Sequence, residues 1–391
     1  MKKIRVGVLF GGRSGEHEIS LLSAASVLKA INREKYDVVP IGITKEGRWI
    51  NPAYSEMLLR GEAPPKELGR QPGDTQAAAS AAVLAKGEAV IVPPSPASGS
   101  LTPFESAAPA NSQGIRVDVI FPVLHGTFGE DGTIQGLLEL ADLPYVGAGV
   151  LGSAAGMDKD VMKRLFSACG LPIVKHVTVL RGQWEREPKK VVREVEGRLK
   201  YPVFVKPANL GSSVGISKAH DRKELGPAIE TAAGYDRKIV IEEGVGGKKH
   251  KARELECAVL GNDHPRSSIA GEIVPAAEFY DYNAKYIDEG SQLVIPAKIA
   301  KKQMKELQEM AVQAFKSVDC SGLARVDFLM DPKNGRIFLN EINTMPGFTS
   351  ISMYPKLWAA SGIGYEELID QLIQLGLERH AERKKNRYSK G

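Results

Sequence analysis

The sequence is poor in cysteine, and the few that it has are far apart. Cys169, Cys257 and Cys320 are its only three cysteines in 391 residues. Their spacing excludes a zinc site built on paired cysteines and a framework of disulfide bonds. The pattern is typical of buried thiols in a reducing compartment.

Long hydrophobic runs are also absent. No stretch reaches the roughly 20 apolar residues that a membrane-spanning helix needs. The first five residues carry the positive charge of a signal peptide, but the apolar run 6–10 is short and Gly11-Gly12-Arg13 ends it. We therefore expect a cytoplasmic protein with no membrane partner.

A strong charge of either sign is missing as well. Lys+Arg 52 against Asp+Glu 47 leaves a net charge of +5, and no basic stripe carries interleaved aromatic residues. This balance argues against a nucleic-acid partner. A length of 391 residues with 43% hydrophobic content predicts two or three packed domains.

The most informative segment that is present consists of two strand patterns joined by a turn. In the first, 323–330, alternation puts Arg325 and Asp327 on one face. In the second, 337–343, alternation groups Leu339, Glu341 and Asn343. Two carboxylates, an amide and a guanidinium can therefore meet if the strands pair in the right register.

The turn between these strands decides the register. A three-residue loop with Gly335 in the left-handed conformation pairs Asp327 with Glu341 and Arg325 with Asn343. A two-residue loop separates them unless a bulge restores the register. Paired, their oxygens suit Mg²⁺ ions that share phosphate oxygens with a nucleotide. The alternative is a hairpin with one solvated polar face.

The amino-terminal part has the pattern of a parallel α/β sheet. Strands are expected at 4–10, 36–44 and 117–123, helices at 19–31 and 133–140, and glycine-rich turns at 11–15 and 124–132. Ligands bind at the carboxyl ends of strands in such sheets. The Ala/Pro/Ser-rich stretch 60–110, with one strand-like piece at 89–93, reads as a surface excursion.

The central part has features of a nucleotide site. After an expected helix at 157–169, Lys206 closes a strand at 203–207 and precedes the glycine-serine loop 208–215, whose N–H groups can hold an anion. No Walker loop is present. Glu242 ends the strand 238–242, and Glu254 follows the Gly/Lys insert 246–251. These groups can contact phosphates, adenine and ribose, or can be solvated surface charges.

The order of the motifs resembles the D-alanine:D-alanine ligases of the ATP-grasp superfamily. The resemblance rests on Gly11-Gly12-Arg13-Ser14-Gly15-Glu16-His17-Glu18-Ile19-Ser20, His125-Gly126 with Gly129-Glu130-Asp131-Gly132, Met157-Asp158-Lys159, Lys206-Pro207 with Gly211-Ser212-Ser213-Val214-Gly215, Phe279-Tyr280-Asp281-Tyr282 with Ala284-Lys285-Tyr286, and the block 325–347. It implies a three-domain α/β ATP-grasp fold with an amino-terminal Rossmann-like parallel-sheet domain. The expected domains are 1–147, 148–249 and 250–391, with a lid loop at 280–292.

The resemblance also implies how the nucleotide is held. Contacts with ATP are expected from Lys159 and Lys206 (phosphates), Ser212 and Ser213 (the closing glycine loop), Glu242 (adenine), Glu254 (ribose), Phe279 (packing on the base) and Lys285. Asp327, Glu341 and Asn343 are expected to bind two Mg²⁺ ions, which Mn²⁺ can replace. The insert 246–251 departs from the family pattern beside the adenine pocket.

The implied reaction joins two D-alanines through an acyl phosphate. Glu16 is expected to bind the ammonium of the first D-alanine with His125 nearby, and Arg325 and the Gly347 N–H to stabilise the oxyanion. The expected ligands of the second carboxylate are Ser352 and the backbone around Met353. The family also implies a homodimer.

The expected choice of second substrate depends on a residue of the lid loop. By resemblance, Tyr286 hydrogen-bonds Ser212, which meets Glu16, and Tyr286 indicates a dipeptide product rather than a D-lactate or D-serine product. The group that deprotonates the second amine stays open among Tyr286, Ser212 and a phosphate oxygen. A regulator that binds nucleotide without turnover is the remaining alternative.

Overall fold

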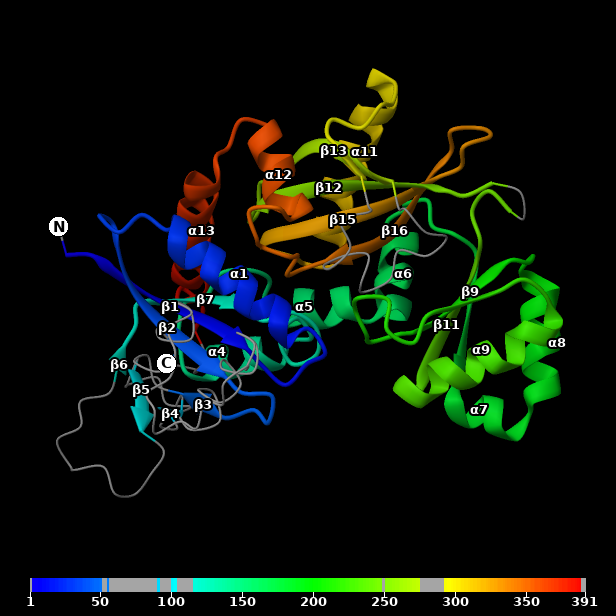
Figure 1. The fold of residues 1–391 in the computed structure, drawn as a ribbon, viewed down its shortest axis with the longest axis horizontal. Helices are drawn as coiled ribbons and strands as arrows, with labels where there is room; N and C mark the ends of the chain where they lie inside the picture. The colour runs from blue at the N-terminus through cyan, green and yellow to red at the C-terminus, as the bar shows by residue number, and fades with distance from the viewer. Residues whose placement is uncertain are drawn as a thin grey trace, which may run out of the picture.

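Three sheets succeed one another along the chain. The computed structural model describes residues 2–50, 55, 90–91, 100–103, 115–247, 250–274 and 292–387. Figure 1 shows the amino-terminal sheet at one end, the β9/β11 unit at the other, and the sheet of β12, β15 and β16 between them. This is the α/β architecture that the sequence predicts.

The amino-terminal sheet has the strand order β3-β2-β1-β7. Its elements are β1 (Ile4–Gly11), α1 (His17–Ala30), β2 (Tyr36–Ile43), β3 (Trp49–Ile50), β7 (Val119–Val123) and α4 (Thr133–Leu140). The central strand β1 runs parallel to both β2 and β7. The chain crosses from β1 to one side for β2 and to the other for β7, so the carboxyl ends of β1 and β7 border a crevice, the place where sheets of this kind generally bind ligands.

Three further short strands form a small separate sheet. It has the order β4-β5-β6 and consists of β4 (Val90–Ile91), β5 (Ser100–Pro103) and β6 (Ile115–Arg116). The strand-like piece expected at 89–93 is therefore confirmed at Val90–Ile91.

The central unit is an antiparallel sheet of order β10-β9-β11-β8 with its own core. Its elements are β8 (His176–Leu180), α7 (Arg181–Arg186), α8 (Pro188–Arg198), β9 (Val203–Pro207), β10 (Ser217–Ala219), α9 (Arg222–Tyr235) and β11 (Lys238–Glu243). The helices α8 and α9 pack on the sheet and on each other. The strands β9 and β11 agree with the prediction to within one residue.

The carboxyl-terminal sheet has five antiparallel strands in the order β14-β13-β12-β15-β16. Its elements are β12 (Arg253–Gly261), β13 (Arg266–Val274), β14 (Gln292–Val294), α11 (Lys301–Ser317), β15 (Gly322–Met330), β16 (Ile337–Asn343), α12 (Met353–Ala360) and α13 (Tyr365–Arg383). The helix α11 packs against four of these strands, while α13 contacts α1 and β7. The carboxyl-terminal helix α13 therefore joins the carboxyl-terminal sheet to the amino-terminal one.

The prediction of a single helix at 157–169 is wrong about where the helix starts. The structure has two helices, α5 (Val150–Met157) and α6 (Lys159–Ala168), separated at Asp158. The Asp158 side chain accepts hydrogen bonds from the N–H groups of Asp160 and Val161, so it caps α6 and ends the preceding helix. Residues of α5 and α6 share a core with β15 and β16, not with β9 and β11. The domain boundaries at 147 and 249 stay a prediction.

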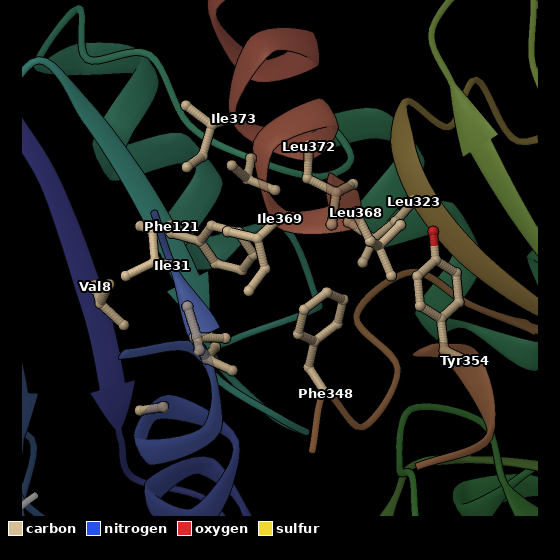
Figure 2. Packing of buried hydrophobic residues seen from close by; sticks show 14 of the residues in the cluster. Val8, Ile31, Phe121, Leu323, Phe348, Tyr354, Leu368, Ile369, Leu372 and Ile373 are labelled. Atoms are coloured by element: carbon tan, nitrogen blue, oxygen red, sulfur yellow. The ribbon is translucent and has the colours of Figure 1, made fainter. Parts of the chain in front are cut away.

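One hydrophobic cluster joins the two ends of the chain (Figure 2). Phe348 lies between Phe121 of β7 and Tyr354 of α12, with ring centroids 5.7 and 5.9 Å away. Leu368 and Ile369 of α13 close the cluster. The loop after β16 is thereby fixed relative to the crevice at β7. Among the helices described, none is both long and apolar enough to cross a bilayer.

Candidate active site

The hairpin β15/β16 brings the predicted metal ligands together. Asp327 pairs with Glu341 and Arg325 with Asn343, as predicted. Gly335 is left-handed with a φ of 70°. The predicted three-residue loop is wrong, because Asp331 N–H donates to the Arg336 carbonyl at 2.9 Å and closes a longer turn. The predicted register arises instead from a bulge between the pairs of Asp327 and Phe328.

The bulge also corrects the predicted faces of the second strand. It occurs at Asn340, and Leu339 points into the core while Glu341 lines the cavity described below. Without the extra residue, strict alternation puts Leu339 and Glu341 on the same face. A period-two pattern in the sequence cannot reveal a bulge, so Leu339 was grouped wrongly.

Arg325 holds two carboxylates on neighbouring strands. Its Nε and Nη2 donate to the two oxygens of Asp327 at 2.7 and 2.6 Å, and Nε lies 3.1 Å from the Glu256 carboxylate. Glu256 lies opposite Asp327 on β12 and is 5% exposed. Glu256 was not predicted as a site residue, although alternation in β12 places it on the same face as Glu254.

A cavity of about 320 Å³ lies between the central and carboxyl-terminal sheets. One wall comes from β9, the glycine loop and β11, and the other from β12, β15 and β16. The predicted site residues that line it are Lys206, Ser213, Glu242, Glu254, Asp327 and Glu341. Gly247, His250 and Lys251 of the insert line it too, so the insert does abut this pocket.

The Glu242 carboxylate is held by two buried lysines. Lys206 Nζ donates to Oε2 at 2.9 Å, and Lys163 Nζ lies 3.0 Å from Oε1. Burial by itself raises the pKa of Glu242, but the two ammonium groups lower it to about 2. Burial lowers the pKa of Lys206, and the Glu242 and Glu341 carboxylates raise it above its usual value. Lys163 was not predicted, because a lysine on an amphipathic helix usually faces solvent.

The glycine loop has the backbone shape of an anion-binding loop. Ser212 and Ser213 both have left-handed φ angles, 49° and 60°. Successive N–H groups in such conformations can converge on an anion. Lys159, the first residue of α6, donates from Nζ to the Leu210 carbonyl at 2.6 Å, so the predicted phosphate lysine touches the predicted loop.

A second, smaller cavity of about 60 Å³ is lined by residues from the amino-terminal, central and carboxyl-terminal parts of the chain. The predicted residues that line it are Glu16, Lys159, Ser212, Arg325, Glu341 and Asn343. Glu16 is 7% exposed, and a Cβ built on Gly211 or Gly126 would come within 3.0 or 3.2 Å of its Oε1. The two glycines therefore leave room for the carboxylate.

Glu130 also lines the smaller cavity and had no predicted role. Its Oε1 accepts the Gly126 N–H at 2.6 Å. Burial, and then the neighbouring Glu16 carboxylate, raise the pKa of Glu130 to about 8. In the sequence, Glu130 is marked only by its place in the Gly129-Glu130-Asp131-Gly132 motif. A motif by itself does not show whether a side chain is buried.

His125 connects the amino-terminal crevice to the loop that follows β16. Its Nδ1 contacts the Met345 carbonyl at 3.0 Å and its Nε2 contacts Ser23 Oγ at 3.0 Å. A carbonyl only accepts, so Nδ1 carries the proton and Ser23 donates to Nε2. Ser23 Oγ in turn accepts the Phe348 N–H at 3.3 Å. Burial lowers the pKa of His125, which keeps the imidazole neutral.

The remaining predicted substrate residues lie in this loop and at the start of α12. Gly347 lies between Met345 and Phe348, and Ser352 precedes α12, where its Oγ contacts Thr349 Oγ1 at 2.8 Å. The Met353 side chain is buried in the core, so only the backbone of Met353 is available to a ligand at the start of α12. Among the described residues, these three do not line either cavity.

Four of the predictions lie outside the described residues. These are Phe279, Lys285, Tyr286 and the lid loop 280–292 apart from its last residue, Gln292, which begins β14. Most of the stretch 60–110 lies outside them as well.

The oxygens on the hairpin fit magnesium shared with a nucleotide. Carboxylates and an amide are the hard ligands that Mg²⁺ takes, and the Arg325 guanidinium is the cation that Asp327 and Glu256 hold here. Asn343 Oδ1 accepts the Met345 N–H at 3.0 Å and retains a second lone pair. Within the described ranges, no three or more His, Cys, Asp or Glu side chains are grouped to hold a metal ion. A small set of protein ligands such as this suits an ion whose other ligands are phosphate oxygens and water.

Two sheets that enclose a cavity lined by lysines and carboxylates, with the amino-terminal part of the chain bordering a smaller cavity beside it, are the arrangement of an ATP-grasp protein. Residues 5–148 match the family description D-ala D-ala ligase N-terminus, and residues 165–374 match D-ala D-ala ligase C-terminus. The chain therefore belongs to the D-alanine:D-alanine ligase family and is an ATP-grasp ligase.

Individual relatives agree over the whole chain. A D-alanine-D-alanine ligase of Natranaerobius thermophilus is 48% identical over 390 residues, 99% of this chain and 98% of the relative. One of Heliobacterium modesticaldum is 49% identical over 387 residues, 99% and 98% of the two chains. The solved D-alanine-D-alanine ligase of Coxiella burnetii aligns with a TM-score of 0.77 at 36% identity, covering 98% and 97%. The VanG D-Ala:D-Ser ligase of Enterococcus faecalis aligns with a TM-score of 0.78 at 36% identity, covering 96% and 100%.

Proposed function

We propose that this chain uses ATP to join two D-alanine molecules into D-alanyl-D-alanine, a precursor of peptidoglycan. The observation that carries the proposal is the meeting of two cavities at Glu341, which lines both. The larger cavity has Lys206 for a triphosphate, and the smaller one has Glu16 for an ammonium group. A nucleotide in the larger cavity and an amino acid in the smaller one can therefore meet at β16, the strand that carries the proposed metal ligand Glu341.

In the first step the carboxylate of the first D-alanine attacks the γ-phosphate and ADP leaves. Phosphoryl transfer needs positioning and charge neutralisation more than covalent chemistry. Lys159 and Lys206 supply the charge, and Ser212, Ser213 and their loop supply N–H groups. Glu16 holds the ammonium of the first D-alanine, and the buried His125 lies behind it.

In the second step the amine of the second D-alanine attacks the acyl phosphate carbon. The developing oxyanion takes hydrogen bonds from Arg325 and the Gly347 N–H. Ser352 and the N–H groups at the start of α12, beginning with Met353, bind the carboxylate of the second substrate. Phosphate then leaves as the amide forms.

Metal ions complete the nucleotide site. Two Mg²⁺ ions, or Mn²⁺ in their place, would be held by Asp327, Glu341 and Asn343, and would neutralise the phosphate oxygens. The Asp327 oxygens that accept from Arg325 in this structure each retain a lone pair, which would be available to such an ion.

We propose that the adenosine end lies in the larger cavity, on the side of Glu242 and Glu254. Glu254 contacts the ribose, and Glu242 with the neighbouring backbone of β11 contacts adenine. For the three residues outside the described ranges, we propose that Phe279 packs on the base, that Lys285 contacts ATP and that Tyr286 belongs to the lid that closes the site. The protein works as a cytoplasmic homodimer of three-domain subunits with boundaries near 147 and 249.

A second candidate product is D-alanyl-D-serine, which the similarity to VanG favours. The test is ADP release with Mg²⁺ and ATP on D-alanine alone, on D-alanine with D-serine, and on D-alanine with D-lactate, with product masses read from the same samples. A D-alanyl-D-alanine mass supports the main proposal. A mixed-product mass in preference to it supports a change of second substrate, and ATP binding without turnover contradicts both.

A further inference from the structure

Lys163 is a fully buried lysine next to the nucleotide cavity. It is the fifth residue of α6, one helical turn after Lys159, so the two lysines share a face of the helix. Its side chain is 1% exposed. A lysine is rarely buried to this degree unless it is paired, so its contacts should reveal what it does.

The contacts of Lys163 join the two walls of the cavity. Its Nζ lies 3.0 Å from Glu242 Oε1 on β11, and it donates to the Asn340 carbonyl on β16 at 3.2 Å. Asn340 is the bulge residue directly before Glu341. One ammonium group therefore ties the strand of Glu242 to the strand that carries the proposed metal ligand.

The second oxygen of Glu242 binds Lys206. Lys206 Nζ lies 2.9 Å from Oε2, so the carboxylate bridges two lysines. Two ammonium groups and one carboxylate leave one net positive charge. If Lys163 were neutral, Glu242 and Lys206 would form a pair with no net charge, and Glu242 would be free to turn toward Lys206.

We infer that Lys163 is a positioning residue for ATP: it holds Glu242 away from full pairing with Lys206, and so keeps the Lys206 charge available for a phosphate beside the Glu341 strand. This inference rests on the proposed contact of Lys206 with the ATP phosphates. Lys163 itself does not touch the nucleotide.

The test is the Lys163→Met variant, compared with the unchanged protein in ATP titrations and in direct binding of MgATP without D-alanine. We expect the KM and Kd for ATP to rise about tenfold or more, and the KM values for D-alanine to stay within twofold. Lys163→Arg keeps the charge and should stay within threefold of the unchanged protein. A lysine that only stabilises the fold would lower the melting temperature and leave the KM for ATP unchanged, which would overturn the inference.

Glu242→Gln tests the route of the effect. Added to Lys163→Met, it removes the carboxylate that would otherwise neutralise Lys206, so the double variant should bind ATP more tightly than Lys163→Met alone. Equal or weaker binding by the double variant would contradict action through Glu242. If Lys163→Met does not fold, Lys163→Gln replaces it with the same expectation, because the amide can still donate to the Asn340 carbonyl.

Lys206→Met separates this inference from the proposed function. If Lys206→Met leaves ATP binding intact, the assignment of Lys206 to the phosphates fails and the inference fails with it. If Lys206→Met weakens ATP binding but Lys163→Met does not, only the role of Lys163 is overturned.

Discussion

His125 Nδ1 donates to the backbone carbonyl of Met345 at 3.0 Å, which links a crevice residue to the loop that carries Gly347. The same imidazole accepts from Ser23, which accepts the Phe348 N–H. The two ends of the loop around Gly347 are therefore held by one neutral histidine and one serine. The position of the proposed oxyanion donor depends on these amino-terminal side chains.

Ser23→Ala should loosen this loop. The change leaves His125 Nε2 and the Phe348 N–H without their buried partner, which costs about 1–3 kcal/mol of stability. We expect kcat to fall about tenfold with little change in the KM for ATP, measured by ADP release and by chemical denaturation. Ser26→Ala, three residues on in α1 and bonded only to the Leu22 carbonyl in the part of the chain described, is the control. An unchanged kcat in folded Ser23→Ala would show that the loop does not need this contact.

Gly211→Ala should disturb the proposed site of the first D-alanine. The added Cβ would come within 3.0 Å of Glu16 Oε1, so the carboxylate must shift. We expect the KM for the first D-alanine to rise about tenfold in initial-rate measurements. Gly197→Ala is the matched control, because a Cβ there meets nothing within 4 Å. Equal kinetics in both variants would argue against Glu16 as the ammonium ligand.

Glu341→Gln should remove most of the turnover. An amide carries no charge for a divalent ion, and loss of even an outer contact of a metal site costs about 10- to 100-fold. We expect ADP release to drop at least about 100-fold, with part of the activity recovered at high Mg²⁺. Glu309→Gln on α11 is the control, since Glu309 forms only an exposed pair with Lys305 in the described structure. Full activity of Glu341→Gln at low Mg²⁺ would contradict the metal assignment.

Glu130 should make the stability of the protein depend on pH. Its pKa rises from 4.5 in the unfolded chain to about 8 in the folded one. The folded state therefore favours the protonated form, and this contribution is fully present below pH 4.5 and is lost as the pH rises toward 8. Relative to the unchanged protein, Glu130→Gln should gain stability between pH 5 and pH 8 in denaturant titrations. A difference between the two proteins that is constant with pH would contradict the raised pKa.

The local patterns of the chain were sufficient for several elements of the site. Alternation and turn residues located the strands around Asp327 and Glu341 and the strand that ends at Lys206, because each pattern depends only on near neighbours in the sequence. The glycine loop is equally local, whereas the cap at Asp158 was missed although its hydrogen bonds are local. The resemblance supplied roles for Glu16 and Ser352 that no local pattern carries.

The errors occurred where a distant contact overrides a local pattern. The bulge at Asn340 reverses the face of Leu339. Lys163 and Glu256 were missed because their burial depends on strands that are far away in the sequence. A charged residue on a helix or strand has the same local pattern whether water or a partner surrounds it.

The sequence by itself determined which residue types are present, where the main strands lie, and which family the chain resembles. Only the tertiary structure decided which charges face one another, because Lys163 on α6 contacts Glu242 on β11 and the Asn340 carbonyl on β16, the latter 177 positions further along the chain. It also decided protonation, since burial beside Glu16 raises the pKa of Glu130 and two lysines lower that of Glu242. Desolvation and Coulomb interaction depend on the surroundings of a group in space, and these are set only when the sheets pack.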